Sequence, residues 1–206
     1  MSESSAAPQT VDFWFDPSCP WAWMASRWVD EVAKYRPIDV TWHIMSLAVL
    51  NENNDVDEEH RAFFPRALRY TRLVAAVREL QGQQAVKPLY DALGTRIHPG
   101  HRKDVDAIIA ESLAEAGLSA DLARYADSDE YDPQMRASHF DGIGRVGQDV
   151  GTPVIAVGDS AFFGPVISPA PSGEQAAALW DNVVGLAGYD GFFELKRSRT
   201  RDPIFE

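Results

Sequence analysis

Hydrophobic and polar positions follow two different periods near the start of the chain. Residues 11–16 form an aromatic-rich run typical of a strand, and residues 38–45 alternate between apolar and polar side chains, which predicts a second strand. Between them, apolar residues at spacings of three and four predict a helix over residues 21–35. We expect Ser18 to cap this helix, with Pro20 in its first turn, where the N–H groups have no partner within the helix.

From about residue 63 to residue 148 the apolar positions recur only at helical spacing, and strand signals are absent. The predicted helices here are 63–80, 105–116 ended by Gly117, a short helix capped by Ser119, and one opened by Asp132. This block is too long to be a plain loop, and we interpret it as an inserted α-helical unit.

Short apolar runs return near the end of the chain. Residues 153–157 and 161–164 are separated by Gly158 and Asp159, which predicts a hairpin, and residues 173–186 have the pattern of an amphipathic helix. The order is therefore strand, helix, strand, helical block, hairpin, helix. It predicts an α/β domain with an α-helical insertion.

Length and charge narrow the function classes. The 206 residues suit one domain with a large insertion, and we assign residues 11–50 and 149–195 to the α/β domain and residues 57–148 to the helical subdomain. The 19 Lys and Arg against 31 Asp and Glu give a formal charge of -12, so we expect neither nucleic acid nor a membrane as partner. No apolar run approaches the ~20 residues of a membrane helix. Residues 1–10 do not resemble a signal peptide, and we expect a cytoplasmic protein.

The single cysteine, Cys19, lies between the first predicted strand and the first turn of the following helix. Backbone N–H groups and the helix dipole favour a thiolate there, so we predict a lowered pKa and a nucleophilic Cys19. The alternative is a buried, inert thiol, the usual environment of a lone cysteine. We expect Asp16 to order the loop without a catalytic role, because its charge opposes a thiolate. One cysteine excludes an intramolecular disulfide.

A second motif, Val150-Gly-Thr-Pro-Val154, places a proline directly before an apolar strand. Proline removes a hydrogen-bond donor from the sheet at that position. We predict a cis bond between Thr152 and Pro153 that presents the Thr152 backbone to a ligand. An ordinary proline at a strand entry is the alternative.

Together, the Cys-Pro turn and the late Thr-Pro resemble the thioredoxin superfamily, and the helical insertion resembles its DsbA-like branch. Longer segments are similar to the actinobacterial mycothiol-dependent reductases of that branch. These segments are Asp12-Phe-Trp-Phe-Asp-Pro-x-Cys-Pro-Trp, Met45-Ser-Leu-Ala-x-Leu-Asn-Glu-Asn, Asp149-Val-Gly-Thr-Pro, Ala161-Phe-Phe-Gly-Pro-Val and Phe192-Phe-Glu-Leu-Lys-Arg. The resemblance implies an α/β thioredoxin fold with a large α-helical insertion.

The resemblance also implies a thiol–disulfide oxidoreductase that takes electrons from mycothiol and reduces mixed disulfides, with nitro compounds as further substrates. It places the nucleophile on Cys19. The family motif is Cys-Pro-Trp-Cys, and here Ala22 stands where the resolving cysteine would be. Either the chain is a natural monothiol member, or a cysteine was replaced at position 22. In both cases only a monothiol cycle is open, in which a low-molecular-weight thiol resolves S-thiolated Cys19.

The other predicted substrate-binding residues surround this motif and the Thr152–Pro153 pair. Pro20, Trp21 and Ala22 follow the thiol, and an aromatic side chain at position 21 suits stacking on a flat substrate. We predict that Asn51 and His60 reach the same pocket, with an exposed turn as the alternative for Asn51. The five histidines show no metal-ligand spacing, so we predict neither a metal ion nor a tightly bound cofactor.

Two other functions fit the same architecture. A kappa-type glutathione transferase or a chromene-carboxylate isomerase would stabilise the thiolate of a bound cofactor without forming a disulfide to Cys19. A non-catalytic thioredoxin-like binding module would lack the second cysteine, as this chain does. In the main interpretation the partners are a low-molecular-weight thiol and a small-molecule or protein disulfide, and a homodimer is left open.

Overall fold

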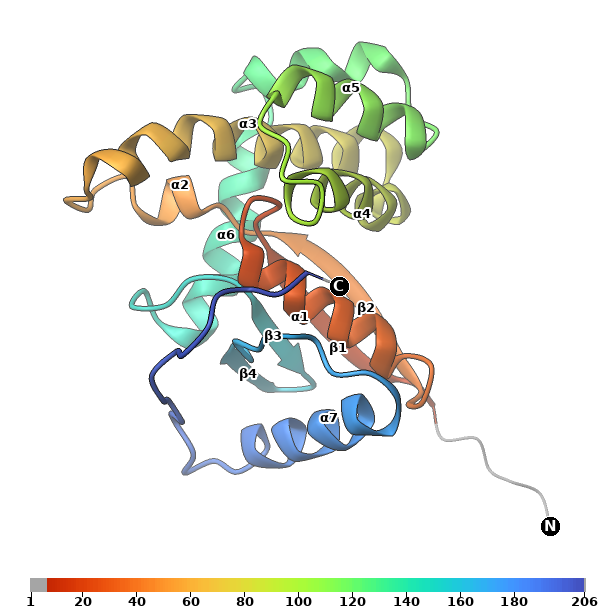
Figure 1. Ribbon diagram of the computed structural model, residues 1–206, viewed down its shortest axis with the longest axis vertical. Helices are drawn as coiled ribbons and strands as arrows, with labels where there is room; N and C mark the ends of the chain where they lie inside the picture. Colours follow the sequence, from red (N-terminus) through yellow and green to blue (C-terminus); the bar gives the residue numbers. More distant parts are fainter. Residues whose placement is uncertain (1–6, 206) are drawn as a thin grey trace.

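The computed structural model describes residues 7–205, and a four-stranded sheet with strand order β2-β1-β3-β4 lies at its centre (Figure 1). β1 pairs in parallel with β2, while β3 runs antiparallel to β1 and β4 antiparallel to β3. The strands are β1 (Gln9–Phe15), β2 (Ile38–Ile44), β3 (Val154–Val157) and β4 (Ser160–Phe163). The two ends of the chain therefore build one sheet, as the hydrophobic pattern predicts.

β1 begins earlier than expected. Gln9 and Thr10, which precede the strand predicted at residues 11–16, pair with Ile38 and Asp39 of β2. Residues 1–6 lie outside the described residues.

Helices cover both faces of the sheet. They are α1 (Pro20–Val32) and α7 (Gly173–Ala187) on one face and α6 (Asp132–Val146) on the other. Phe15 shares a buried cluster with Trp28 of α1, and the Trp28 indole N–H donates to the Ala176 carbonyl of α7 at 2.9 Å. The next residue along β1, Trp14, faces the opposite way and packs with Ile143 of α6. α6, the last helix of the predicted insertion, thus packs against the sheet itself.

The other helices form a separate layer beside the carboxyl end of β1 (Figure 1). They are α2 (Leu47–Leu50), α3 (Glu58–Gln81), η1 (Gln83–Ala85), α4 (Val86–Ile97), α5 (Val105–Glu115) and η2 (Ala120–Asp127). The sequence pattern did not separate α2 or α4. Pro88 and Gly94 obscure the period of α4, although proline is tolerated in a first turn and Gly94 has a packing role.

Gly94 allows α4 to lie directly against α1. A Cβ atom at Gly94 would lie 2.2 Å from the Trp23 ring of α1, so only glycine permits this approach. The Tyr90 ring also packs against Trp23, edge to face, with the ring centroids 5.7 Å apart. The Trp23 side chain is buried as a result, and it joins the helical layer to the sheet layer.

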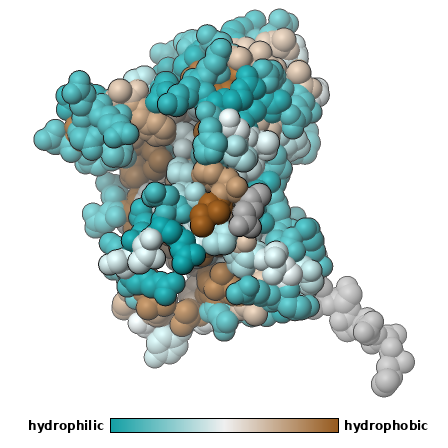
Figure 2. All heavy atoms as spheres, viewed as in Figure 1, coloured by the Kyte–Doolittle hydropathy of each residue, from teal (hydrophilic) through white to brown (hydrophobic). Residues whose placement is uncertain are grey.

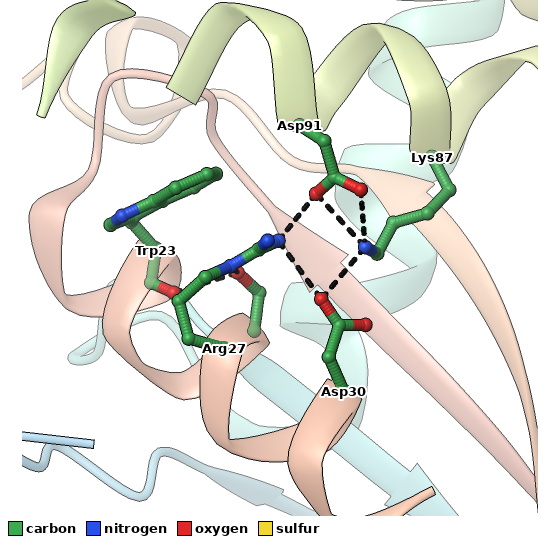
Figure 3. A network of polar contacts seen from close by, with 6 residues as sticks. Trp23, Arg27, Asp30, Lys87 and Asp91 are labelled. Carbon is green, nitrogen blue, oxygen red and sulfur yellow. Dashed lines mark hydrogen bonds and ion pairs between the residues drawn. The ribbon is translucent and has the colours of Figure 1, made fainter. Parts of the chain in front are cut away.

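Charged side chains reinforce the same contact (Figure 3). Arg27 of α1 lies 4.0 Å from the centroid of the Trp23 ring and pairs with Asp91 of α4. Lys87 of α4 reaches back to Asp30 of α1 at 2.9 Å and also contacts Asp91 at 2.7 Å. Two cations and two carboxylates therefore alternate across the boundary between α1 and α4.

No helix among residues 7–205 is both long and apolar enough to cross a membrane.

Candidate active site

Cys19 is the N-cap residue of α1. Its Sγ atom accepts a hydrogen bond from the Ala22 backbone N–H at 3.5 Å, and its thiol donates to the Thr152 carbonyl oxygen at 3.4 Å. The predicted cap, Ser18, was wrong, because the Ser18 hydroxyl donates to Asp16 Oδ1 at 2.6 Å instead. Pro20 occupies the first helical turn, as predicted. The thiol therefore lies between the start of α1 and the residue before β3.

Burial dominates the electrostatics of the Cys19 thiol. The residue is only 5% exposed, and loss of solvent raises its pKa above the ordinary value of a thiol. The backbone N–H groups of Ala22 and Trp21 act in the opposite direction, and the charge of Asp16 adds to the increase. The predicted lowering of the pKa was wrong, because desolvation outweighs the hydrogen bonds of the helix start.

Asp16 holds the turn that carries Cys19. Its Oδ1 atom accepts from the Ser18 backbone N–H at 2.8 Å as well as from the Ser18 hydroxyl, and its Oδ2 atom accepts from the Leu47 N–H at 2.8 Å. The carboxyl is fully buried, which raises its pKa to about 6. The expectation that Asp16 orders the loop is confirmed, and the Leu47 contact also ties the loop to α2.

His98 supports the turn from the helical layer, and the sequence analysis missed it. Its Nε2 atom lies 2.9 Å from the Pro17 carbonyl oxygen, a distance that suits an N–H donor on Nε2. Burial lowers the pKa of His98 to about 4, so the ring is neutral at pH 7. Its position beside Pro99 and Gly100 suggested only a turn. No local signal indicates a partner 81 residues away.

The Thr152–Pro153 segment faces Cys19. The peptide bond between these residues is cis, and Thr152 is buried. The Thr152 carbonyl oxygen accepts from the thiol, and the Pro153 carbonyl accepts from the Gly164 N–H at 2.8 Å, which fixes the segment to the loop after β4. The two motifs that the sequence singled out therefore meet at one point.

The C-terminal segment crosses this region in front of α1 (Figure 1). The Arg199 guanidinium lies 5.1 Å from the centroid of the Trp21 ring, and the Phe205 ring lies 5.6 Å from that of His98. Figure 2 shows a small hydrophobic patch where this segment ends, on a face that is otherwise largely hydrophilic. Trp21, which lies under Arg199 of the C-terminal segment, is partly buried, whereas Ala22 is fully buried in the core.

The match to a family model decides the relationship. Residues 18–197 match the model described as Rv2466c-like, mycothiol-dependent nitroreductase Rv2466c. The chain belongs to the Rv2466c-like family.

Other proteins are similar to this chain over most of its length. The chain is 28% identical over 193 residues to the uncharacterized protein Rv2286c of Mycobacterium tuberculosis (strain ATCC 25618 / H37Rv). This match covers 93% of this chain and 83% of that protein. The probable DsbA oxidoreductase SCO1869 from Streptomyces coelicolor is 16% identical with a TM-score of 0.59, covering 93% of this chain and 94% of that chain. The cytosolic disulfide reductase DsbM from Pseudomonas aeruginosa with GSH is 19% identical with a TM-score of 0.53, and the match covers 86% of this chain and 100% of that chain. These structures confirm the predicted thioredoxin fold with a DsbA-like helical insertion.

Two predicted substrate-binding residues of this Rv2466c-like protein, Asn51 and His60, lie at the end of α2 and in the first turn of α3. The Asn51 side-chain amide donates to the Leu47 carbonyl at 2.8 Å, and Asn51 lines a cavity of about 370 Å³ between α2 and α3. His60 is exposed in the first turn of α3, and its ring bonds to Asp57 at 2.8 Å. Of the predicted residues, the structure brings Cys19 and Thr152 into direct contact and gives Asn51 and His60 other partners.

Within residues 7–205, no three His, Cys, Asp or Glu side chains are grouped so that they could hold a metal ion. His139, for example, is buried, and its Nδ1 atom accepts from the Ser46 N–H at 3.3 Å.

Proposed function

We propose that this protein catalyses thiol–disulfide exchange with Cys19 as a monothiol nucleophile and a low-molecular-weight thiol, mycothiol, as reductant. One observation carries the proposal: the Cys19 sulfur lies between the Ala22 N–H at the start of α1 and the backbone of Thr152. The N–H groups suit a developing thiolate, and the Thr152–Pro153 backbone offers hydrogen bonds to an extended substrate. The mycothiol-dependent family supports the choice of reductant.

The exchange is balanced with one protein thiol. The Cys19 thiolate attacks a mixed disulfide R–S–S–R′, forms Cys19–S–S–R and releases R′–S⁻, which takes a proton from water. A mycothiol thiolate then attacks the R sulfur, releases the Cys19 thiolate and leaves as a new disulfide. When R is itself mycothiol, the products are the reduced target thiol and mycothiol disulfide.

The environment of Ala22 supports a monothiol cycle. The Ala22 side chain is a methyl group and is fully buried, so position 22 itself supplies no resolving thiol. Cys19 is the only cysteine in the sequence, and resolution must therefore come from an external thiol. Activity in the cytoplasm, where low-molecular-weight thiols are reduced, fits this requirement.

The experiment is to incubate the protein with mycothiol disulfide and to measure its intact mass. We expect one mycothiol adduct per chain, removed by added mycothiol, and no adduct on Cys19→Ser. Ala22→Cys should lose two hydrogens in place of the adduct, because the second thiol can close an intramolecular disulfide with Cys19. Absence of any adduct at pH 8 on the starting protein would refute the exchange mechanism.

One observation favours a second function, a non-catalytic thioredoxin-like binding module: burial raises the pKa of Cys19. Adduct formation with mycothiol disulfide separates the two. An adduct on Cys19 supports the enzyme although the pKa of the thiol is raised, whereas a raised pKa together with no adduct supports the binding module. The isomerase and kappa-type transferase alternatives predict a stable cofactor thiolate and no adduct on Cys19.

A further inference from the structure

A cavity of about 150 Å³ lies next to the turn that carries Cys19. Ser18, the residue before the nucleophile, forms part of its wall, and the other walls come from α3, from the end of α4, from the loop between α4 and α5 and from the first residue of α5. The lining residues are Ser18, Phe63, Arg66, Ala67, Tyr70, Ile97, Arg102, Lys103 and Val105. An apolar interior of this size suits a single aromatic ring.

Three cations lie around this cavity in a chain whose formal charge is -12. Arg102 is neutralised, because its Nη2 atom bonds to Glu111 at 2.8 Å. The ion pairs among residues 7–205 include neither Arg66 nor Lys103, whereas Arg69, Arg72 and Arg102 each have a carboxylate partner. Two positive charges therefore remain for a ligand.

Nearby carboxylates are occupied with other tasks. Asp104 caps α5 by accepting from the Ala107 N–H at 3.1 Å, and Asp106 pairs with Arg69 at 2.7 Å. Tyr70 adds a neutral group, since burial raises the pKa of its hydroxyl to about 12. The phenol can therefore donate a hydrogen bond to an anion and does not repel it.

We propose that this cavity binds the anionic group and ring of the substrate, so that small aromatic disulfides with an anionic group are the preferred substrates. The inference rests on the proposed function of Cys19 and adds the substrate class. Arg66 and Lys103 attract the carboxylate and Phe63 and Val105 contact the ring. Ser18 lines the cavity and precedes Cys19, so the attached disulfide extends past Ser18 toward the thiol.

Two disulfide reagents test the proposal, because they differ mainly in charge. The anionic reagent is 5,5′-dithiobis(2-nitrobenzoate), and the neutral one is 4,4′-dithiodipyridine. In both reactions the Cys19 thiolate forms a mixed disulfide with one aryl sulfur and releases the other as a coloured thiolate or thione, one per chain. The second-order rate constants are measured by stopped flow at low salt and at 0.5 M NaCl.

For the double variant Arg66→Ala/Lys103→Ala, we expect the rate with the anionic reagent to fall about tenfold at low salt, and the neutral reagent to change less than about twofold. Arg61→Ala is the matched control, because it removes a cation from the same helix at the other cavity, and we expect both rates to stay within about twofold. High salt should abolish the advantage of the anionic reagent in the starting protein.

The outcomes separate the two proposals. Equal losses with both reagents, or no loss with either, would overturn the anion site and leave the exchange function intact. If Cys19 reacts with neither reagent, the exchange function fails, and calorimetric titration with 4-nitrobenzoate then decides the site alone. Heat that disappears in the double variant and persists in Arg61→Ala supports it, and no heat in the starting protein refutes it.

Discussion

The helical layer contacts the region around Cys19 on two sides, and the two sides differ in how their cations are used. Along α1 and α4, Arg27 and Lys87 each have carboxylate partners, and Trp23 packs so tightly on Gly94 that no Cβ atom fits between them. Beside Ser18, a cavity remains instead. Closely packed, neutralised contacts hold layers together, whereas an unfilled cavity with unpaired charge is suited to a ligand.

The comparison also concerns the groups that hold each side in place. The α1–α4 side depends on partly exposed ion pairs and on aromatic packing. The side beside Ser18 depends on Asp16, a fully buried carboxyl that accepts two hydrogen bonds from Ser18 and one from Leu47. We therefore expect the first side to respond to changes in packing and salt, and the second to respond to pH.

The largest effect is expected from Gly94→Ala, which breaks the tight side. The new Cβ atom would lie 2.2 Å from the buried Trp23 ring, so α4 must move, and we expect a loss of about 3 kcal/mol in the free energy of unfolding. Urea denaturation measures it. The matched control is Gly144→Ala in α6, where nothing lies within 4 Å and a gain of about 0.5–1 kcal/mol is expected. Equal effects at both positions would contradict the close approach.

Asp16→Asn tests the buried side. Burial raises the pKa of Asp16 from 3.8 to about 6, so its contribution to stability is complete below pH 4 and is lost as the pH rises through 6. The shift in the pKa of Asp16 corresponds to a change of about 3 kcal/mol in the free energy of unfolding, and we expect to measure about 2–3 kcal/mol of it. The free energies of unfolding at pH 4.5 and at pH 7.5 should therefore differ less in Asp16→Asn than in the starting protein.

His98 changes stability in the opposite direction over the same range. Its pKa is lowered to about 4, so its contribution is lost as the pH falls below 6.5. The difference between the variant and the starting protein isolates Asp16, since His98 is present in both. A difference that does not depend on pH would show that Asp16 is ionised throughout.

The smallest effect is expected from Arg27→Ala, which removes one cation from the α1–α4 network. The Arg27 side chain is 31% exposed and that of Asp91 is 36% exposed, so solvent screens the pair, and we expect a loss of about 1 kcal/mol. A double-mutant cycle with Asp91→Asn measures the coupling. Arg145→Ala is the control, because Arg145 also lies over a tryptophan but pairs with Asp141 within one helix, and its effect should be below about 0.5 kcal/mol. A coupling energy near zero would mean that the Arg27–Asp91 ion pair does not stabilise the contact between α1 and α4.

Much of the fold could be predicted from the sequence, because local periodicity defined it. The alternation over residues 38–45 and the hairpin at Gly158 and Asp159 gave strands that the structure confirms. α4 could not be separated, since Gly94 is there to admit Trp23 from a distant helix and weakens the helical signal locally. Its role depends on a contact that no short window of sequence contains.

The candidate site was predictable in position and less so in chemistry. The meeting of Cys19 with Thr152 followed from two motifs and a family resemblance. The direction of the thiol pKa was missed, because it depends on how much of the chain covers the sulfur, a property of the packed structure. Arg66 and Lys103 carried no motif, and only the fold brings them together with Ser18.

The course of the C-terminal segment has a practical consequence for anyone who labels or immobilises this protein. Arg199 rests over Trp21 and Phe205 over His98, so a fusion added after the last residue would emerge beside the nucleophile. β1 runs from Gln9 toward the thiol, so the start of the strand lies roughly 20 Å from the thiol turn, at the opposite end of the strand (Figure 1). An affinity tag, fluorophore or surface tether is therefore better joined through the start of β1 than after Phe205.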